Sequence, residues 1–388
     1  MSDNNKVSIK LIEACKLEDE DLVKSLLEGN PDVDLQDKYS ITALMYACSR
    51  GNMNIVKMLL EHNPNVDLKD KDGKTALMYA SQYNNVEIVK LLLEHNPNVD
   101  LKNKNGWTAL IWLCYLNNVK LVKLLLEHNP IVDLKDKYGM TALIYACQHN
   151  NAEIVKLLLE HNPNVDLKDE DGKTALIYAC QYNNAEIVKL LLEHNPNTNL
   201  QDKDGMTALM YACNYKNTKF VELLLERKLN INLQDKYGMT ALMYACRVGN
   251  ANADIVESLL EHNPNVNLQN KNGETALMYA CKSDNASIVK LLLEHNPDVS
   301  LKDKDGETVL KYAKNECSIL LKTYRRVPST LKNIIMSLLE QQKNKVELTN
   351  LKKMAGKDTF AMLTRPHSEK INRERVIKKT KKKKKIKD

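Results

Sequence analysis

The chain has 388 residues, of which 43% are hydrophobic and 27% charged, and its formal net charge is +6. This balance is normal for a folded protein, and no apolar run approaches the ~20 residues that a membrane-spanning helix needs. The first residues also lack the apolar stretch of a signal peptide. We therefore expect an intracellular protein, in the cytoplasm or the nucleus, and not a secreted one.

The tripeptide Thr-Ala-Leu recurs along the chain at a fixed interval. It begins at Thr42 and Thr75 and returns every 33 residues, with one longer step from Thr240 to Thr275. A fixed period of this size indicates a stack of small, nearly identical units. The predicted units are an N-terminal capping repeat at 6–38, eight repeats at 39–71, 72–104, 105–137, 138–170, 171–203, 204–236, 237–271 and 272–304, and a shortened C-terminal repeat at 305–326.

The unit at 138–170 shows the local pattern. Thr141 can cap a first helix, and the Asn150-Asn151 pair can cap a second. Isolated helices this short are marginal in water, so neighbouring units must stabilise them. The predicted inward faces are Ala142, Leu143, Ala146 and Cys147 in the first helix, and Ile154, Val155, Leu158 and Leu159 in the second. A hairpin-like loop then leads to the next unit, so the expected fold is all-α.

These units resemble ankyrin repeats. The family pattern of a turn Gly, Thr-Pro-Leu-His and a second helix with Ile-Val-x-x-Leu-Leu is met at 72–104 by DGKTALMYA and NNVEIVKLLLEHNP. Ala76 replaces the family's Pro, Met78 replaces its His, and Asn replaces its loop Gly. The resemblance covers about residues 6–326. It implies a solenoid of about ten repeats of paired antiparallel helices, with no cofactor, that binds a protein on its concave face.

The composition of the repeats makes this family resemblance more specific. They are nearly identical to one another and rich in Asn and Lys. In this they are similar to the ankyrin-repeat proteins of giant DNA viruses of amoebae. We expect a monomer.

Cysteine and histidine occupy repeat slots and do not form metal-binding motifs. No CxxC pair is present, and cysteines one repeat apart are expected about 8 to 10 Å from one another, too far for a disulfide. Cys317 lies outside the slot and is the thiol most worth testing for reactivity. The slot cysteines are Cys15, Cys48, Cys114, Cys147, Cys180, Cys213, Cys246 and Cys281.

Seven histidines share the word His-Asn-Pro, which we interpret as a helix stop. A polar or cationic side chain suits the end of a helix, and the following Pro prevents its continuation. Arg227 replaces the histidine in one repeat, which a ladder of metal ligands would not tolerate. The seven are His62, His95, His128, His161, His194, His262 and His295.

No motif in the chain assembles an enzyme site. Phosphate-binding glycine motifs are absent, and the recurring KDKDG lacks the closing Glu of a 12-residue calcium loop. No acid, base and nucleophile come together in a recognisable motif. We therefore expect a protein that is not an enzyme, with no catalytic, cofactor-binding or metal site.

Variation between the repeats is confined to the tip residue before Thr and to the exposed end of the first helix. The repeat at 105–137 stands out because it holds both tryptophans, and clustered Trp and Tyr often dominate binding energy. Neutral drift at exposed positions gives the same pattern, and Trp112 can be merely packed between repeats. The predicted partner-binding residues are Trp107, Trp112, Tyr115 and Leu116, with Tyr83, Met140, His149, Tyr182 and Tyr215 around them.

The period is lost after residue 326, and the charge changes sign. Residues 327–388 hold 18 Lys and Arg against 6 Asp and Glu, a net +12, which leaves −6 for the rest of the chain. We expect 348–388 to be a basic and largely disordered tail. Its lysines can form a nuclear import signal, a nonspecific nucleic-acid contact or only a solubilising end. They are Lys378, Lys379, Lys381, Lys382, Lys383, Lys384 and Lys385.

Apolar residues at helical spacing predict an amphipathic helix at 327–347. The simpler interpretation is a helix that covers the open end of the stack. The alternative is that 327–339 resembles the opening of an F-box, which in some viral ankyrin proteins recruits a ubiquitin ligase. That alternative implies a substrate adaptor.

Overall fold

The structure, a computed structural model, describes residues 3–247 and 253–325. The chain divides into two compact units, Met1–Lys203 and Asp204–Asp388. The predicted helix at 327–347, its F-box-like part and the Lys-rich tail lie outside the described residues, as does Val248.

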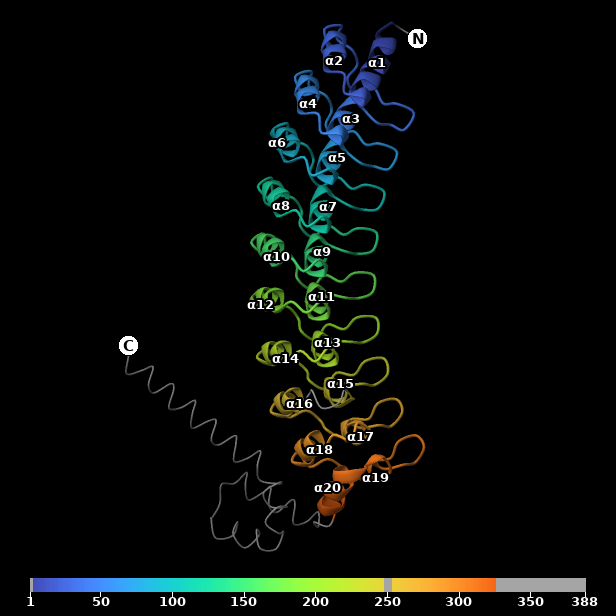
Figure 1. The fold of residues 1–388 in the computed structure, drawn as a ribbon, viewed down its shortest axis with the longest axis vertical. Helices are drawn as coiled ribbons and strands as arrows, with labels where there is room; N and C mark the ends of the chain where they lie inside the picture. Colours follow the sequence, from blue (N-terminus) through green and yellow to red (C-terminus); the bar gives the residue numbers. More distant parts are fainter. Residues whose placement is uncertain (1–2, 248–252, 326–388) are drawn as a thin grey trace, which may run out of the picture. The chain divides into compact units, whose positions relative to one another are not determined.

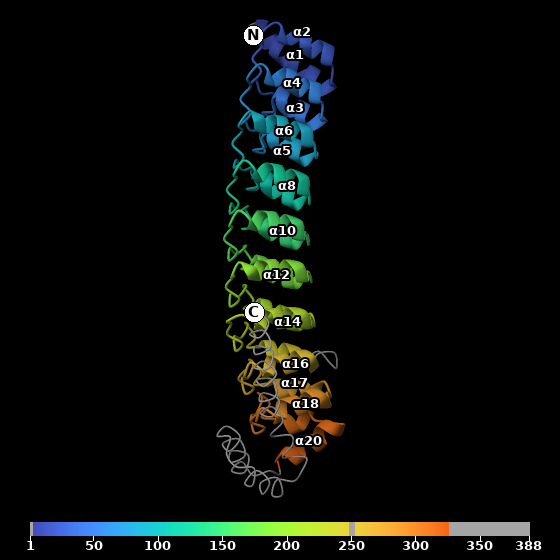
Figure 2. The same cartoon turned by 90° about the vertical axis from the view of Figure 1, so that its left-hand side faces the viewer.

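Within each unit the helices form two rows, and the loops between repeats project beyond the odd-numbered row (Figure 1). Helices α8, α10 and α12 lie side by side in the turned view (Figure 2). In the first unit the odd-numbered row is α1 (Asp3–Leu17), α3 (Ala43–Arg50), α5 (Ala76–Gln82), α7 (Ala109–Tyr115), α9 (Ala142–Gln148) and α11 (Ala175–Gln181), and the even-numbered row is α2 (Glu20–Leu27), α4 (Met53–Leu60), α6 (Val86–Glu94), α8 (Val119–Leu126), α10 (Ala152–Leu159) and α12 (Ala185–Glu193).

The second unit repeats this arrangement. Its odd-numbered row is α13 (Ala208–Asn214), α15 (Ala241–Arg247), α17 (Ala276–Lys282) and α19 (Val309–Tyr312), and its even-numbered row is α14 (Thr218–Leu225), α16 (Ala253–Leu260), α18 (Ala286–Leu293) and α20 (Asn315–Arg325). Apart from an isolated bridge between Lys302 and Thr308, the described residues contain no β-structure. The all-α prediction is confirmed for this part of the chain.

The predicted helix caps are in place. The Thr141 hydroxyl accepts a hydrogen bond from the backbone N–H of Ile144 at 3.2 Å, which starts α9. The Asn151 side chain accepts one from the N–H of Ile154 at 2.9 Å, which starts α10. Asn150, just before it, takes a left-handed φ of 61°, a conformation that Asn tolerates better than most residues.

The His-Asn-Pro word ends an even-numbered helix. The Nδ1 atom of His95 lies 3.0 Å from the Leu91 carbonyl oxygen, so a ring N–H can donate to a carbonyl in the last turn of the helix. Asn96 then takes a left-handed φ of 49° and turns the chain. His194 and His262 make the same ring contact to the carbonyl four residues earlier. The interpretation of the word as a helix stop is confirmed at these three histidines.

The predicted inward faces of the unit at 138–170 are buried at all eight positions. A fully buried Leu or Ile side chain stabilises the fold by about 1.5–3 kcal/mol relative to an exposed one. Met78 and Ile111, at the position of the family's His, are also buried. Apolar packing therefore takes the place of the polar contacts that the family's His supplies.

All cysteines in the described part of the chain are buried and free. Burial alone raises the pKa of Cys180 to about 12. Cys317 is also buried, in α20, which packs against α18. Burial and a hydrogen bond to Asp284 raise its pKa to about 11. The structure therefore does not support Cys317 as a reactive thiol, because the thiolate form is disfavoured and covered.

Most tip loops are organised by their own aspartate, and the loops of Asn103 and Asn270 have asparagine at that position. Oδ1 of Asp136 accepts hydrogen bonds from the backbone N–H groups of Tyr138 and Met140 at 2.8 and 2.9 Å. Oδ2 accepts one from the Tyr145 hydroxyl at 2.8 Å. We call the latter contact the Asp–Tyr bond. It recurs at Asp37–Tyr46, Asp70–Tyr79, Asp169–Tyr178, Asp235–Tyr244 and Asp303–Tyr312.

Lysines tie consecutive repeats of the first unit together. The Lys69 ammonium donates to the carbonyl oxygen of Lys102 at 2.9 Å, exactly one repeat later. Lys102, Lys135 and Lys168 each make the same contact to the next repeat, at 2.6 to 2.8 Å. Charge-assisted hydrogen bonds of this kind are stronger than neutral ones, so they fix the spacing between loops.

Candidate protein-binding face

Both tryptophans lie on the loop face of the first unit. Trp107 is the tip residue before α7, and its indole Nε1–H donates to Oδ2 of Asp136 in the next repeat at 3.0 Å. Its ring meets the Trp112 ring edge to face, with centroids 4.8 Å apart. Trp107 therefore joins two repeats and presents only part of its surface to solvent.

Tyr115 and Tyr145 extend this group across the repeat boundary. The Tyr115 ring centroid lies 5.0 Å from that of Trp107, 5.9 Å from that of Tyr145 and 5.1 Å from that of His149. Aromatic pairs at these separations are favourable beyond the area they bury. We call Trp107, Trp112, Tyr115, Tyr145 and His149 the aromatic cluster.

Trp112 plays a mixed part in the cluster. Its side chain is half-buried, and the Lys74 ammonium from the preceding repeat lies 5.0 Å from its ring centroid, as in a cation–π contact. Its indole N–H is buried without a hydrogen-bond partner. Trp112 is thus partly packed between repeats, as the simpler interpretation of this residue expects, and it supports the more exposed rings.

The remaining predicted residues lie in different settings. Tyr115 and Leu116 are 44% and 41% exposed at the end of α7. Tyr83, His149 and Tyr182 are exposed at the equivalent ends of α5, α9 and α11. Tyr215 is exposed in the second unit, where it stacks on Tyr211.

Met140 is only 7% exposed. The expectation that it lies at an exposed tip is wrong. Its side chain is buried, whereas Trp107, at the same position of the previous repeat, keeps part of its surface exposed. A flexible thioether packs well at such a buried position.

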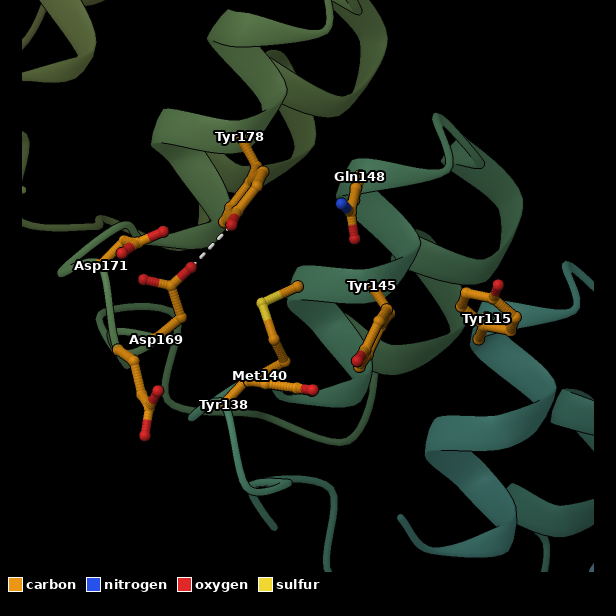
Figure 3. Close-up of a pocket in the computed structure, with 9 residues that line it drawn as sticks. Tyr115, Tyr138, Met140, Tyr145, Gln148, Asp169, Asp171 and Tyr178 are labelled. Atoms are coloured by element: carbon orange, nitrogen blue, oxygen red, sulfur yellow. Dashed lines mark hydrogen bonds between the residues drawn. The ribbon is translucent and has the colours of Figure 1, made fainter. Parts of the chain in front are cut away.

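A hollow of about 410 Å³ opens beside the aromatic cluster, between the tip loops of two consecutive repeats (Figure 3). The Glu170 N–H donates to the Tyr138 carbonyl oxygen at 2.8 Å and joins the two loops. We call it the tip hollow. It is lined by Tyr115, Tyr138, Tyr145 and Tyr178, by Met140 and Gln148, and by Asp169, Glu170 and Asp171.

Electrostatics keep the wall of this hollow in defined protonation states. Burial and the hydrogen bond to Asp169 raise the pKa of Tyr178, so its hydroxyl remains a donor. Burial and the bond to Asp136 do the same for the pKa of Tyr145. In the neighbouring aromatic cluster, partial burial lowers the pKa of His149.

Sequence reasoning missed the tip hollow and the Asp–Tyr bond. The hollow draws on three repeats, and no single repeat contains the pattern. The Asp–Tyr bond joins residues nine apart in a loop and a helix, which no simple periodicity links. A signal for it did exist, because the repeat with Trp112 in place of Tyr also has Asn103 in place of Asp.

Some chemistry is not supported by the described residues. Within 3–247 and 253–325, no group of His, Cys, Asp and Glu side chains is arranged to hold a metal ion. In the same ranges, no helix combines the length and apolar character needed to cross a bilayer. The tip aspartate Asp70, in one of the recurring KDKDG words, directs its oxygens to the Lys74 backbone N–H and the Tyr79 hydroxyl.

The paired helices, the capped loops and the face that they share define a repeat-built helical scaffold. A model of ankyrin repeats, taken three at a time, matches the chain at 11–103, 95–169, 131–202, 161–235, 194–268 and 242–324. The chain therefore belongs to the ankyrin-repeat family, whose members typically serve as protein-interaction modules. No curated protein was found to match the chain.

Proposed function

We propose that this chain is a non-catalytic scaffold that binds a partner protein on the face formed by the tip loops and the odd-numbered helices. The aromatic cluster carries the proposal, because it gathers two Trp and two Tyr rings within contact distance and leaves Tyr115 open to solvent. Large aromatic anchors next to partly open surface are the usual centre of a protein interface. An intracellular, monomeric protein is part of the same proposal.

The finer resemblance also belongs here. The near-identity of the repeats and their richness in Asn and Lys support an origin among the ankyrin proteins of giant DNA viruses of amoebae. Such an origin fits a scaffold that acts on proteins of a host cell. It identifies no partner by itself.

The test replaces the cluster's two most variable residues by those of other repeats. The Lys74 ammonium donates to Oε1 of Gln82 at 3.0 Å, and Lys173 does the same to Gln181 at 3.1 Å. The double substitution Trp107→Lys with Tyr115→Gln recreates this pair in the repeat at 105–137. It removes the Trp107 bond to Asp136, but the Asp136 carboxylate keeps its bond from the Tyr145 hydroxyl. Removal of interface anchors costs at least ~2 kcal/mol, so we expect partner binding to weaken about 30-fold or more.

The measurement is affinity purification followed by a binding titration with the recovered protein. Tyr39→Ala is the control, because Tyr39 is an exposed tip tyrosine in another repeat of the same unit. Circular dichroism of each variant checks the helix content. Equal recovery of the same proteins by the wild type and the double variant would show that the cluster is not the binding centre.

A second candidate function is a role in the nucleus or on nucleic acid. The net +12 charge of residues 327–388 supports it, although these residues lie outside the described part of the chain. Such binding would be made to phosphates and would weaken steeply with salt. Deletion of 376–388 should then abolish nuclear accumulation or salt-sensitive retention on DNA, and an unchanged distribution and retention would exclude this role.

A ubiquitin-ligase adaptor role is the third candidate. Its support is the spacing of apolar residues in 327–339, which also lie outside the described residues. Co-purification with a Skp-type adaptor would favour it. Failure to recover such an adaptor would remove it.

A further inference from the structure

The tip hollow has walls of tyrosine and methionine and a rim of acidic residues. Met140 and Tyr145 are buried at its base, and the Tyr138 and Tyr115 rings are exposed beside it (Figure 3). Tyrosine faces and a thioether offer an apolar and polarisable surface. Its volume of about 410 Å³ falls within the range of pockets that hold small groups. The hollow can therefore hold one long side chain of a docked protein.

The rim is acidic. Asp169 is committed to the fold, because it accepts hydrogen bonds from the Tyr178 hydroxyl at 2.6 Å and from the Lys173 N–H at 2.8 Å. Glu170 and Asp171 are exposed, and among the described residues their carboxylates have no hydrogen-bond or ion-pair partner. Two carboxylates without a direct partner therefore lie beside the tyrosine rings.

Two lysines beside the hollow are already engaged. The Lys173 ammonium donates to Oε1 of Gln181 at 3.1 Å and lies 5.6 Å from the Tyr178 ring centroid. The Lys137 ammonium donates to Oδ1 of Asn105 at 2.8 Å and lies 4.9 Å from the Tyr138 ring centroid. Neither neutralises Glu170 or Asp171 through a direct contact. The residues that line the hollow include no lysine or arginine.

Glu170 is the departure that makes this rim acidic. Every other tip loop from the second repeat onward has a lysine at the same position, two residues before Gly or, in the loop with Ser40, before Ser. In the tip hollow alone this position carries the opposite charge. The lysines are Lys38, Lys71, Lys104, Lys137, Lys203, Lys236, Lys271 and Lys304.

We propose that the tip hollow binds a lysine or arginine side chain of the partner protein, with its aliphatic stem against the tyrosines and Met140 and its charged head at Glu170 and Asp171. This inference rests on the proposed function and names the chemistry of the partner. Charge complementarity carries it, because the position that is positive in all eight other loops is negative here.

The test restores the repeat's usual residue. Glu170→Lys places a lysine where eight other loops already hold one, so the loop keeps its fold. The matched control is Glu153→Lys, which makes the same change of charge on the exposed side of α10. Lys120 and Lys219 occupy that position in other repeats, so this substitution is tolerated as well.

The probes are two labelled heptapeptides, one with three central basic residues in a Ser-Gly frame and one with three glutamines in the same frame. Fluorescence anisotropy with the full chain measures their binding. We expect the basic peptide to bind more tightly than the glutamine peptide, Glu170→Lys to weaken it about ten-fold or more, and Glu153→Lys to change it less than two-fold. Equal weakening by both substitutions, or none by Glu170→Lys, overturns the proposal.

Two further arms separate the remaining outcomes. If the full chain with Lys381, Lys382 and Lys383 changed to Gln binds the basic peptide about ten-fold more tightly, the occupant is the chain's own tail, and the proposal of a partner side chain is wrong. A partner that is lost by Trp107→Lys with Tyr115→Gln but kept by Glu170→Lys overturns only this inference. A partner kept by both variants overturns the proposed binding face.

Discussion

Two neighbouring repeats stabilise the same loop in different ways. In the repeat of α9, the Asp136 carboxylate accepts from the Tyr145 hydroxyl, whereas in the repeat of α7 the equivalent residues are Asn103 and Trp112. An indole has no hydroxyl to donate, and a buried carboxylate without its donor would be costly. Asn103 removes that charge, while its Oδ1 still accepts from the N–H groups of Asn105 and Trp107 at 2.9 Å.

The difference teaches that the repeat at 105–137 compensates for the missing Asp–Tyr bond both within itself and through the next repeat. Trp107 donates to Asp136, so a hydrogen bond inside one repeat is replaced by one between two repeats. The second unit holds a third solution, in which Tyr279 donates to Glu274 at 2.8 Å and Asn270 donates to both of them. Positions that vary for binding therefore also carry part of the loop's stability.

The largest effect is expected from removing the shared acceptor. Asp136→Ala leaves the Tyr145 hydroxyl, the Trp107 indole and two backbone N–H groups without their acceptor, and it should lower the free energy of unfolding by about 2–4 kcal/mol. Asn103→Ala removes only the two backbone contacts and should cost about 1–2 kcal/mol less. Both tryptophans lie in this region, so urea unfolding followed by Trp fluorescence measures it. Equal losses of unfolding free energy in the two variants would show that the Tyr145 and Trp107 contacts to Asp136 do not stabilise the loop.

The next effect is a coupling between the two exchanged positions. Asn103→Asp should destabilise the chain while Trp112 is present, and it should be neutral or stabilising when Trp112→Tyr supplies the hydroxyl. We expect a coupling energy of about 1–2 kcal/mol in the double-mutant cycle. Trp107 remains as the fluorescent reporter throughout. Additive effects would mean that Asn103 and Trp112 changed independently.

A smaller effect should separate two Asp–Tyr bonds. Tyr79→Phe leaves Oδ2 of Asp70 without a donor, whereas Tyr145→Phe leaves the Asp136 carboxylate with its Trp107 contact. We expect Tyr79→Phe to cost about 1–2 kcal/mol and Tyr145→Phe about 1 kcal/mol less, by thermal or urea unfolding. The reverse order would show that the Trp107 bond contributes little.

The smallest effect is a pH dependence in the second unit. Burial disfavours the Glu274 carboxylate, but hydrogen bonds from Lys282, Asn270 and Tyr279 outweigh it and lower the pKa of Glu274. Because the folded-state pKa lies below the unfolded value, this contribution is complete above about pH 4.5 and is lost as the pH falls through the folded-state pKa.

The effect is modest because Glu274 is partly exposed and solvent screens its contacts. Glu274→Gln should flatten the acid side of the stability curve, measured by unfolding between pH 3 and 7. Glu307→Gln is the control, since Glu307 occupies the same tip position and makes only an exposed pair with Lys311 at 3.4 Å. An unchanged acid limb in Glu274→Gln would contradict the assignment.

The sequence predicts the period, the caps and the core because each depends on residues close together in the chain. Thr141 and Asn151 cap helices through contacts three residues away, and the apolar faces follow helical spacing. These are local rules, and nearly identical copies repeat them. The structure of one repeat can therefore be predicted closely from its own amino-acid sequence.

The site depends on contacts that no single repeat contains. Met140 and Trp107 occupy the same position in consecutive repeats, yet one is buried and the other lies across the loop, because the size of the side chain decides which neighbours it meets. The tip hollow needs Tyr115, Tyr145 and Tyr178 from three repeats. The reversed charge at Glu170 can be read from the sequence, but its position on the rim of the tip hollow depends on the neighbouring loop.

The buried slot cysteines can serve as probes of local opening in the repeats that carry them. Because each of these thiols is buried, an alkylating reagent can label a repeat only while that repeat is open. Peptide masses after brief labelling would then report the order in which the stack comes apart. The repeat at 72–104 would stay silent, because it carries the buried Ser81 in place of cysteine.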